Sequence, residues 1–311
     1  MWDAGRQDEA LDCFLQNIVK YGADRTALGM DLLLDEWIGM AKQLPPEQAE
    51  KAWQNLQALL TEARQEKQAT LVLRLQRCML YKPGINLVEK EAHRAALLNE
   101  RNIPLASPMV LEFIMDEAAK QGNDSLTVQA AERIINDFPE TDYAPEARMT
   151  VAQKALEKGN HETAREQLET ITEQFAANRI AADALLLLGQ LHMGKGEFSK
   201  ADECFEDILG VREWRGPTWP ATIYRRGEIA MKKGDFRTAS AFFERIYLLY
   251  SNYTQWTAKA YIQRAKCLTK LREYEKVREV LEEMLAQEEL AQTAEAAEAK
   301  EALERASGRL Q

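Results

Sequence analysis

The stretch KGEFSKADECFEDIL at residues 195–209 recurs as KGDFRTASAFFERIY at residues 233–247. Both stretches have Lys-Gly, an acidic residue, Phe, two polar residues and Ala, then an aromatic residue four positions after the Ala and Ile three positions later. A third copy, KGNHETAREQLETIT, begins at residue 158, and weaker copies begin at residues 121 and 271. Self-similarity at a fixed spacing indicates a repeat architecture.

The five copies share one turn position, which lies 37 or 38 residues from the same position in the next copy. The residues at this position are Gly122, Gly159, Gly196, Gly234 and Arg272. Glycine accepts the left-handed backbone conformation that commonly follows the last residue of a helix, so the position predicts a helix end. Beyond it, Ala201, Phe205 and Ile208 fall on one face of a helical period. Each copy therefore predicts two helices joined by a short turn.

This pattern resembles the tetratricopeptide repeat. The resemblance rests on small residues in the first helices, an alanine and an aromatic residue in the second helices, and a proline near the repeat end. These residues are Gly189, Gly227, Ala164, Ala201, Ala239, Phe205, Phe243 and Pro139. It implies an all-α fold, a superhelix of helix-turn-helix repeats (an α-solenoid). The longer period and the Phe-Pro repeat end are similar to bacterial cell-envelope members such as the Tol-Pal coordinator and the outer-membrane assembly lipoprotein.

Three segments are expected along the chain. Residues 107–286 hold the five repeats, and residues 1–106 form less regular helical hairpins that are also similar to tetratricopeptide repeats. Within this first segment helices are predicted over residues 5–22, 24–44, 45–67, 68–82 and 85–100. The two prolines of RNIPLASP, residues 101–108, mark the boundary. Residues 287–311 are rich in Ala and Glu and predict a long capping helix or tail, with a partner-binding helix as the alternative.

Composition argues against several classes of protein. The chain of 311 residues has a formal net charge of −10, whereas nucleic-acid binding requires a basic surface. The four cysteines lie at least 63 residues apart, which disfavours a disulfide framework or a local zinc site. No run of 18 apolar residues occurs, so the sequence predicts no membrane-spanning helix.

The sequence carries no recognisable catalytic motif. The three histidines, His93, His161 and His192, are isolated from one another, and His192 falls where the family usually packs an aromatic residue. The motifs HExxH, GxSxG and GxxxxGK[ST] are absent. We therefore expect no catalytic residues, no metal, no cofactor and no enzymatic activity.

The resemblance also implies a concave groove lined by one face of each first helix. The residues at those positions, which form the candidate partner-binding site, are Met149, Gln153, Leu186, Gln190, Met193, Tyr224, Glu228, Met231, Lys232, Ile262, Lys266 and Lys270. The apolar members would form a track that suits an adaptable peptide surface. The lysines, with Lys259, would make the C-terminal end of the groove basic. Ordinary packing between repeats beside a solvated lysine face is the alternative interpretation.

Aromatic residues crowd two stretches of the later repeats, REWRGPTWP at residues 212–220 and YLLYSNYTQW at residues 247–256. Trp, Tyr and Arg are enriched at the energetic centres of protein interfaces, so these stretches are a second candidate surface. Filling of the gaps created by the longer repeats is the alternative.

The function expected from these features is non-catalytic capture of a peptide or a partner's helix in the concave groove. The alternative is a structural scaffold subunit that self-assembles through its edges or its C-terminal helix. The expected partner is a protein or peptide, with no nucleic acid and no membrane span, and the oligomeric state is open. The expected location is the bacterial cell envelope or periplasm, with the native N-terminus upstream of Met1, and a cytoplasmic location is the alternative.

Overall fold

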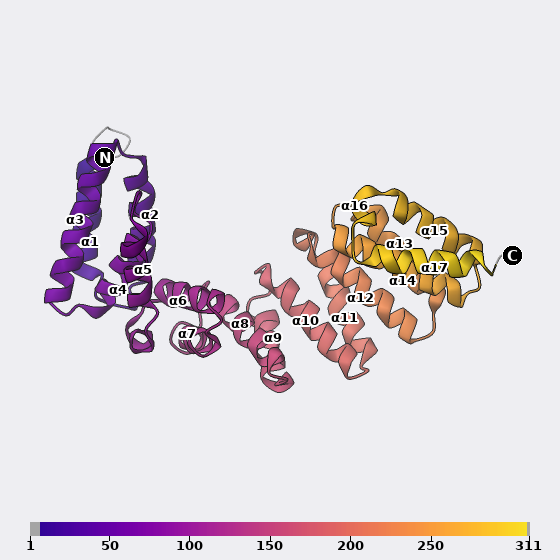
Figure 1. The fold of residues 1–311 in the computed structure, drawn as a ribbon. Helices are drawn as coiled ribbons and strands as arrows, with labels where there is room; N and C mark the ends of the chain where they lie inside the picture. The colour runs from indigo at the N-terminus through magenta and orange to yellow at the C-terminus, as the bar shows by residue number, and fades with distance from the viewer. Residues whose placement is uncertain (1–6, 310–311) are drawn as a thin grey trace. The chain divides into compact units, whose positions relative to one another are not determined.

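The computed structural model describes residues 7–309, and its regular structure there consists of helices (Figure 1). The prediction of an all-α repeat fold is confirmed. Backbone contacts divide the chain between Asn160 and His161 into two compact units, called here the N-terminal unit and the C-terminal unit. This division lies within the predicted repeat segment 107–286, and the three-segment organisation stays a prediction.

The N-terminal unit begins with helices that follow the predicted ranges closely. They are α1 (Gln7–Tyr21), α2 (Leu28–Gln43), α3 (Pro46–Gln65), α4 (Ala69–Met79) and α5 (Leu87–Leu97). Pro46 starts α3, a position where the missing N–H of proline costs nothing. Asn86 caps α5, because its side chain accepts a hydrogen bond from the Glu89 N–H at 2.9 Å. The first two residues of the predicted helix 5–22 lie outside the described residues.

The first predicted repeats follow within the same unit. A 3-10 turn, η2 (Glu100–Leu105), leads into α6 (Pro108–Lys120), α7 (Asp124–Asp137) and α8 (Ala144–Glu157). The unit has two hydrophobic cores, one built by α1 to α4 and the other by residues from α4 to α8. Trp37 and Trp53 meet edge to face in the first core, with ring centroids 5.0 Å apart. Such aromatic pairs stabilise a core beyond the area they bury.

A buried ion pair joins distant parts of the N-terminal unit. The Nε of Arg74 in α4 lies 2.7 Å from the Asp31 Oδ1 in α2, and both side chains are almost fully buried. The same guanidinium donates hydrogen bonds to the carbonyl oxygens of Gly22, Asp24 and Ala27 in the loop before α2. Ser107 donates to the Asp31 Oδ1 from the residue before α6. Arg74 thus ties the loop between α1 and α2 to α4 through one buried guanidinium.

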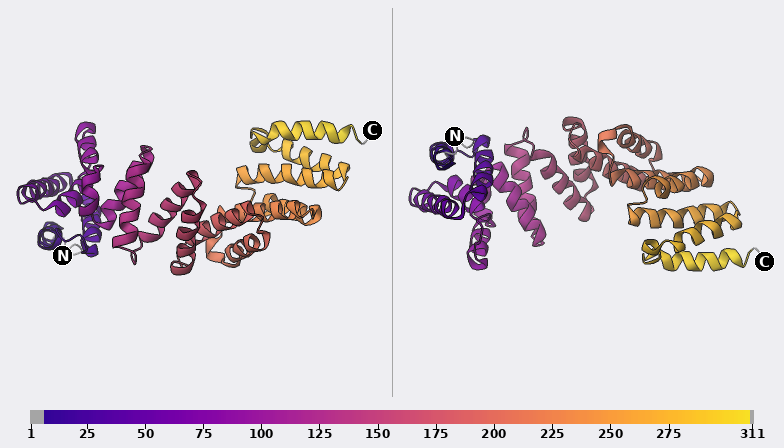
Figure 2. Two further views of the ribbon diagram at one scale, coloured as in Figure 1. Left: turned by 90° about the horizontal axis from the view of Figure 1, so that it is seen from below. Right: turned by 90° about the horizontal axis from the view of Figure 1, so that it is seen from above.

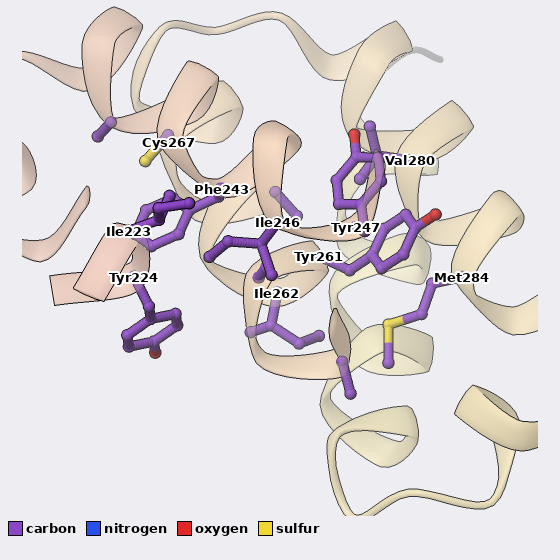
Figure 3. Packing of buried hydrophobic residues seen from close by; sticks show 14 of the residues in the cluster. Ile223, Tyr224, Phe243, Ile246, Tyr247, Tyr261, Ile262, Cys267, Val280 and Met284 are labelled. Carbon is purple, nitrogen blue, oxygen red and sulfur yellow. The ribbon is translucent and has the colours of Figure 1, made fainter. Parts of the chain in front are cut away.

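The C-terminal unit consists mainly of successive helical hairpins. Its helices are α9 (His161–Gln174), α10 (Ile180–Gly194), α11 (Phe198–Gly210), α12 (Thr218–Lys232), α13 (Phe236–Leu249), α14 (Thr254–Lys270), α15 (Tyr274–Ala286), α16 (Glu288–Ala291) and α17 (Glu295–Ser307), with the 3-10 turn η3 (Arg212–Trp214) before α12. A continuous core runs from α11 to α17. Figure 3 shows its centre, where Ile246 and Tyr247 of α13 face Tyr261 and Ile262 of α14. The Tyr247 and Tyr261 rings stack with centroids 4.0 Å apart.

The five predicted turn residues all adopt the left-handed conformation. The φ angles are 71° at Gly122, 73° at Gly159, 76° at Gly196, 78° at Gly234 and 60° at Arg272. In each case the following N–H bonds back across the end of the helix, as from residue 235 to the carbonyl oxygen of residue 230 at 2.9 Å. This is the hydrogen bond of a Schellman helix end. The equivalence inferred from the sequence is therefore confirmed in the backbone.

A sixth turn of the same type lies outside the predicted repeats. Lys67 has a φ of 58°, and the N–H of Gln68 bonds to the Ala63 carbonyl oxygen at 2.9 Å. This turn joins α3 to α4, so that hairpin closes in the same way as the repeats. The sequence offers no glycine there, and the equivalence was missed.

The hairpins of the third and fourth repeats pack through a glycine and a phenylalanine. A Cβ on Gly189 would lie 2.3 Å from the ring of Phe205, and a Cβ on Gly227 would lie 2.7 Å from the ring of Phe243. Both rings are fully buried. The small residue in the first helix thus lets the aromatic ring of the second helix fill the contact.

The C-terminal segment differs from the single helix that was predicted. Gln287 is extended, with φ −89° and ψ 115°, which ends α15. A second break follows α16, where the Thr293 hydroxyl bonds to the Leu290 carbonyl oxygen at 2.7 Å. Such local side-chain bonds compete with helix continuation. After these breaks α17 packs against α15 and α14, and the three helices run side by side at the yellow end of the chain (Figure 2).

Candidate functional site

The predicted groove residues lie on four first helices. Met149 and Gln153 belong to α8 of the N-terminal unit, where Met149 is buried and Gln153 is exposed. The remaining residues belong to α10, α12 and α14 of the C-terminal unit. Within that unit two surface hollows contain predicted residues.

The first hollow lies between α10 and α12 and has a volume of about 320 Å³. It is called the α10–α12 hollow, and its lining residues are Gln190, Met193, Gly194, Arg225, Glu228 and Lys232. Four of these were predicted from the sequence. Arg225 forms an ion pair with Glu228 at 2.7 Å, one helical turn away. The hollow therefore presents an amide, a thioether and three charged groups at one place.

The second hollow lies between α14 and α17 and has a volume of about 350 Å³. It is called the C-terminal pocket, and its lining residues are Ile262, Ala265, Lys266, Thr269, Lys270, Tyr274, Glu298, Ala302, Arg305, Ala306 and Arg309. Ile262, Lys266 and Lys270 were predicted. The residues of α15 and α17 were missed. Glu298, Ala302, Arg305 and Arg309 recur at the three- and four-residue spacing of a single helix face, and this signal was available in the sequence.

Three predicted contact residues offer little surface. Met149, Tyr224 and Ile262 are only 4–7% exposed. Tyr224 packs against Phe243 and Trp256, and its hydroxyl accepts a hydrogen bond from Gln263 Nε2 at 3.1 Å. Burial raises the pKa of the Tyr224 phenol. Their role in partner binding stays a prediction, and their visible contribution is to packing.

The other apolar residues of the predicted track are half-buried. Leu186, Met193 and Met231 pack against the core of the C-terminal unit and keep part of their surface exposed. Half-buried methionine offers a flexible apolar surface without leaving a cavity behind. These residues can contact a partner while the fold stays intact.

The predicted lysines differ in their surroundings. Lys266 forms an ion pair with Glu298 of α17 at 3.0 Å. Lys232 and Lys259 lie over the rings of Phe198 and Trp256, at 6.0 and 5.3 Å from the ring centroids. For Lys270 no carboxylate of the described residues lies within ion-pair distance. The C-terminal end of the predicted groove therefore carries several lysines, and Glu298 of α17 neutralises Lys266.

The aromatic stretches mainly fill space between repeats. Trp214, Trp219, Tyr247 and Tyr250 are each less than 10% exposed. The Arg215 guanidinium contacts both the Trp219 and the Tyr250 rings, at 5.7 and 5.8 Å from their centroids. This favours the gap-filling interpretation, because buried rings cannot anchor a partner.

Residues that could hold a metal are dispersed. Within residues 7–309 no three His, Cys, Asp or Glu side chains cluster as metal ligands would. His192 Nδ1 pairs with Glu197 at 2.6 Å, and burial lowers the pKa of His93.

None of the helices in the described part of the chain is long and apolar enough to cross a membrane.

Comparison with known proteins supports the resemblance over the repeats. Residues 110–254 match the family described as a tetratricopeptide repeat-like domain. The crystal structure of yeast Tom70 aligns with a TM-score of 0.52 and 13% sequence identity, over 98% of this chain and 59% of that chain. The Cut9–Hcn1 hetero-tetramer of the APC/C aligns with a TM-score of 0.48 and 17% identity, over 99% of this chain and 68% of that chain. No curated protein matches in sequence.

Of these two alignments the one with Tom70 has a TM-score above 0.5, and at 13% identity it shows the fold alone. The chain spans 59% of the length of the Tom70 chain it matches. Residues 110–254 thus match a tetratricopeptide repeat-like domain family, and the described residues form a helical repeat fold.

Proposed function

We propose that the chain is a non-catalytic protein-interaction module that captures a peptide or a partner's helix in the groove formed by its first helices. The supporting observation is the α10–α12 hollow. Gln190 and Met193 come from one repeat, Glu228 and Lys232 from the next, and all four line the same space. Residues of two successive repeats thus meet at one accessible surface, among them the equivalent pair Gln190 and Glu228.

The chemistry of this hollow suits a peptide. Half-buried Met193 supplies apolar contact, and Gln190 can both donate and accept hydrogen bonds to a peptide backbone. Glu228 and Lys232 supply opposite charges one turn apart. The hollow thus offers one apolar contact beside several groups that can bond to a peptide backbone or to charged side chains.

The test compares the full chain with two triple variants. Gln190→Ala/Glu228→Ala/Lys232→Ala removes polar groups of the hollow. Lys200→Ala/Glu203→Ala/Asp207→Ala removes exposed groups from α11, the second helix of the same repeat, and is the matched control. Proteins retained from a lysate of the source organism are compared by quantitative mass spectrometry. We expect the first variant to lose specific partners and the control to keep them. If both variants retain the same partners in equal amounts, the α10–α12 hollow is not the binding site.

Self-assembly as a scaffold is the second candidate, and it receives less support from α17. Ala296 and Ala299 of this helix are buried within the same chain, so they are not available to a second copy. Light scattering with mass determination distinguishes the candidates. A concentration-dependent oligomer that protects Gln190 and Lys232 from solvent would favour the scaffold.

The likeness to bacterial cell-envelope repeats and the absence of a nucleic-acid partner remain parts of the proposal. The net charge of −10 supports the second of these. Fractionation of the source organism, with immunodetection of the chain in each fraction, tests the location.

A further inference from the structure

The C-terminal pocket has walls from three helices. Ile262, Lys266 and Lys270 come from α14, Tyr274 begins α15, and Glu298 to Arg309 come from α17 and the residues after it. Its apolar lining consists of half-buried Ala302 and the small exposed parts of Ile262, Ala265 and Ala306, which are otherwise buried. Alanines leave room above them, so the pocket can accept one medium-sized apolar side chain.

The charge of this pocket is opposite to that of the protein. Four lining residues are cationic (Lys266, Lys270, Arg305 and Arg309), and one, Glu298, is acidic. The whole chain, by contrast, carries a net charge of −10. A local cluster of one sign within a hollow concentrates the field for a ligand of the other sign. The pocket is therefore complementary to carboxylates.

The four cationic side chains of the pocket differ in whether they already have a partner within the protein. Lys266 pairs with Glu298 at 3.0 Å, and both side chains are about half exposed, 47% and 46%. Arg305 lies 3.6 Å from Glu301, and both are largely exposed. Arg309 donates a hydrogen bond to the Tyr274 hydroxyl at 2.8 Å and lies over the same ring. Exposed pairs are weak, so an incoming carboxylate can displace Glu298 from Lys266 at little cost.

We propose that the C-terminal pocket binds an acidic peptide segment in which carboxylates flank one apolar side chain. The apolar side chain lies over the alanines of α14 and α17, and the carboxylates pair with Lys270 and with Lys266, which exchanges Glu298 for the ligand. This inference rests on the proposed function, because it names the partner chemistry for one end of the same groove. The inference is supported by the positive charge of the pocket, by its apolar lining and by its volume.

The probe is a short fluorescein-labelled peptide, amidated at its C-terminus, with paired glutamates on both sides of a central leucine. Three matched peptides accompany it. One has glutamine for every glutamate, one has serine for the leucine, and one ends in a free carboxylate. Fluorescence anisotropy with the full chain measures affinity. We expect the glutamine peptide to bind about tenfold more weakly and the serine peptide several-fold more weakly.

Variants of the protein are expected to shift the affinity in opposite directions. Lys270→Glu replaces an attraction with a repulsion and weakens binding about fivefold to tenfold. Glu298→Gln removes the internal competitor for Lys266 and strengthens binding about threefold. Lys300→Glu is the matched control on α17, because Lys300 is exposed and does not line the pocket. A stronger effect of the free carboxylate peptide would identify a chain terminus as the ligand's source of charge.

The inference is overturned if the glutamine peptide binds as tightly as the glutamate peptide, or if Lys270→Glu and Lys300→Glu have equal effects. Absence of any binding by the glutamate peptide also overturns it. None of these results affects the comparison of α10–α12 hollow variants, so the proposed function is judged separately. Thermal unfolding of each variant verifies that its fold is retained.

Discussion

The ring of Phe243 lies so close to Gly227 that a Cβ at residue 227 would come within 2.7 Å of the ring. Phe243 is fully buried and also meets the Tyr224 ring at 5.3 Å, so it has little freedom to move. The distance between the two helices of the fourth repeat is therefore set by the absence of a single methyl group.

We expect Gly227→Ala to destabilise the fold by about 1–3 kcal/mol, because the added methyl overpacks a filled contact. Gly39→Ala is the control, since Gly39 lies inside α2 and a Cβ added there would meet nothing within 4 Å. There the change should stabilise by up to about 1 kcal/mol through helix propensity. Urea unfolding followed by circular dichroism measures the stability change of each variant. A change of the same sign in Gly227→Ala and Gly39→Ala would contradict the packing argument.

Arg272 occupies the left-handed position that glycine holds in the other four repeat turns. We expect Arg272→Gly to stabilise the protein by about 1 kcal/mol, because only a residue with a Cβ bears the conformational penalty. The reverse change at an equivalent turn, Gly234→Ala, should destabilise by a similar amount. Thermal unfolding midpoints test the pair. A loss of stability in Arg272→Gly would mean that contacts of the arginine side chain stabilise the fold by more than the left-handed backbone conformation costs.

Arg74 is bound to the Asp31 carboxylate and to three loop carbonyl oxygens inside the N-terminal unit. We expect Arg74→Met to cost about 3–5 kcal/mol, because it leaves the buried Asp31 carboxylate without its counter-charge and the Gly22 carbonyl without its side-chain donor. Arg278→Met removes an arginine of α15 whose ion pair with Glu282 is exposed on both sides, and should cost less than about 1 kcal/mol. Denaturant unfolding compares the two. Similar losses of stability in the two variants would show that burial does not determine the contribution of the Arg74–Asp31 pair.

Burial, and then the neighbouring Asp116 carboxylate, raise the pKa of Glu112 in α6. A carboxyl with a raised pKa in the folded state stabilises the fold below its unfolded pKa, and that contribution is lost as the pH rises through the folded pKa. We therefore expect Glu112→Gln to increase stability at pH 7 by a few tenths of a kcal/mol to about 1 kcal/mol. The gain should vanish near pH 3.5. Exposed Glu140→Gln is the control, and a gain that does not depend on pH would refute the electrostatic cause.

Local signals predicted the repeat architecture well. The glycine position, the alanine and the aromatic residue act over a few residues of sequence, so Gly196, Ala201 and Phe205 specify a turn and a helix contact by themselves. The turn at Lys67 was missed because its conformation is imposed by the packing of α3 on α4 rather than by a permissive residue.

Long-range pairs could not be foreseen from the sequence. Arg74 and Asp31 lie 43 positions apart, and their meeting depends on how two hairpins pack. The ion pair between Lys266 and Glu298 requires the breaks on either side of α16, which turn α17 back against α14. Both breaks arise from single residues in a sequence that otherwise favours helix, and composition alone predicts a continuous one.

The short segment around α16 is the exposed link through which the chain reaches α17. Gln287, Glu288 and Glu289 are exposed, and cleavage there would detach α17 together with Glu298, Arg305 and Arg309. The remaining wall of α14 would keep Lys266 and Lys270 but lose the opposite side of the pocket. A single proteolytic cut would then open the pocket on one side, and its complementarity to carboxylates would depend on the integrity of the last turns of helix.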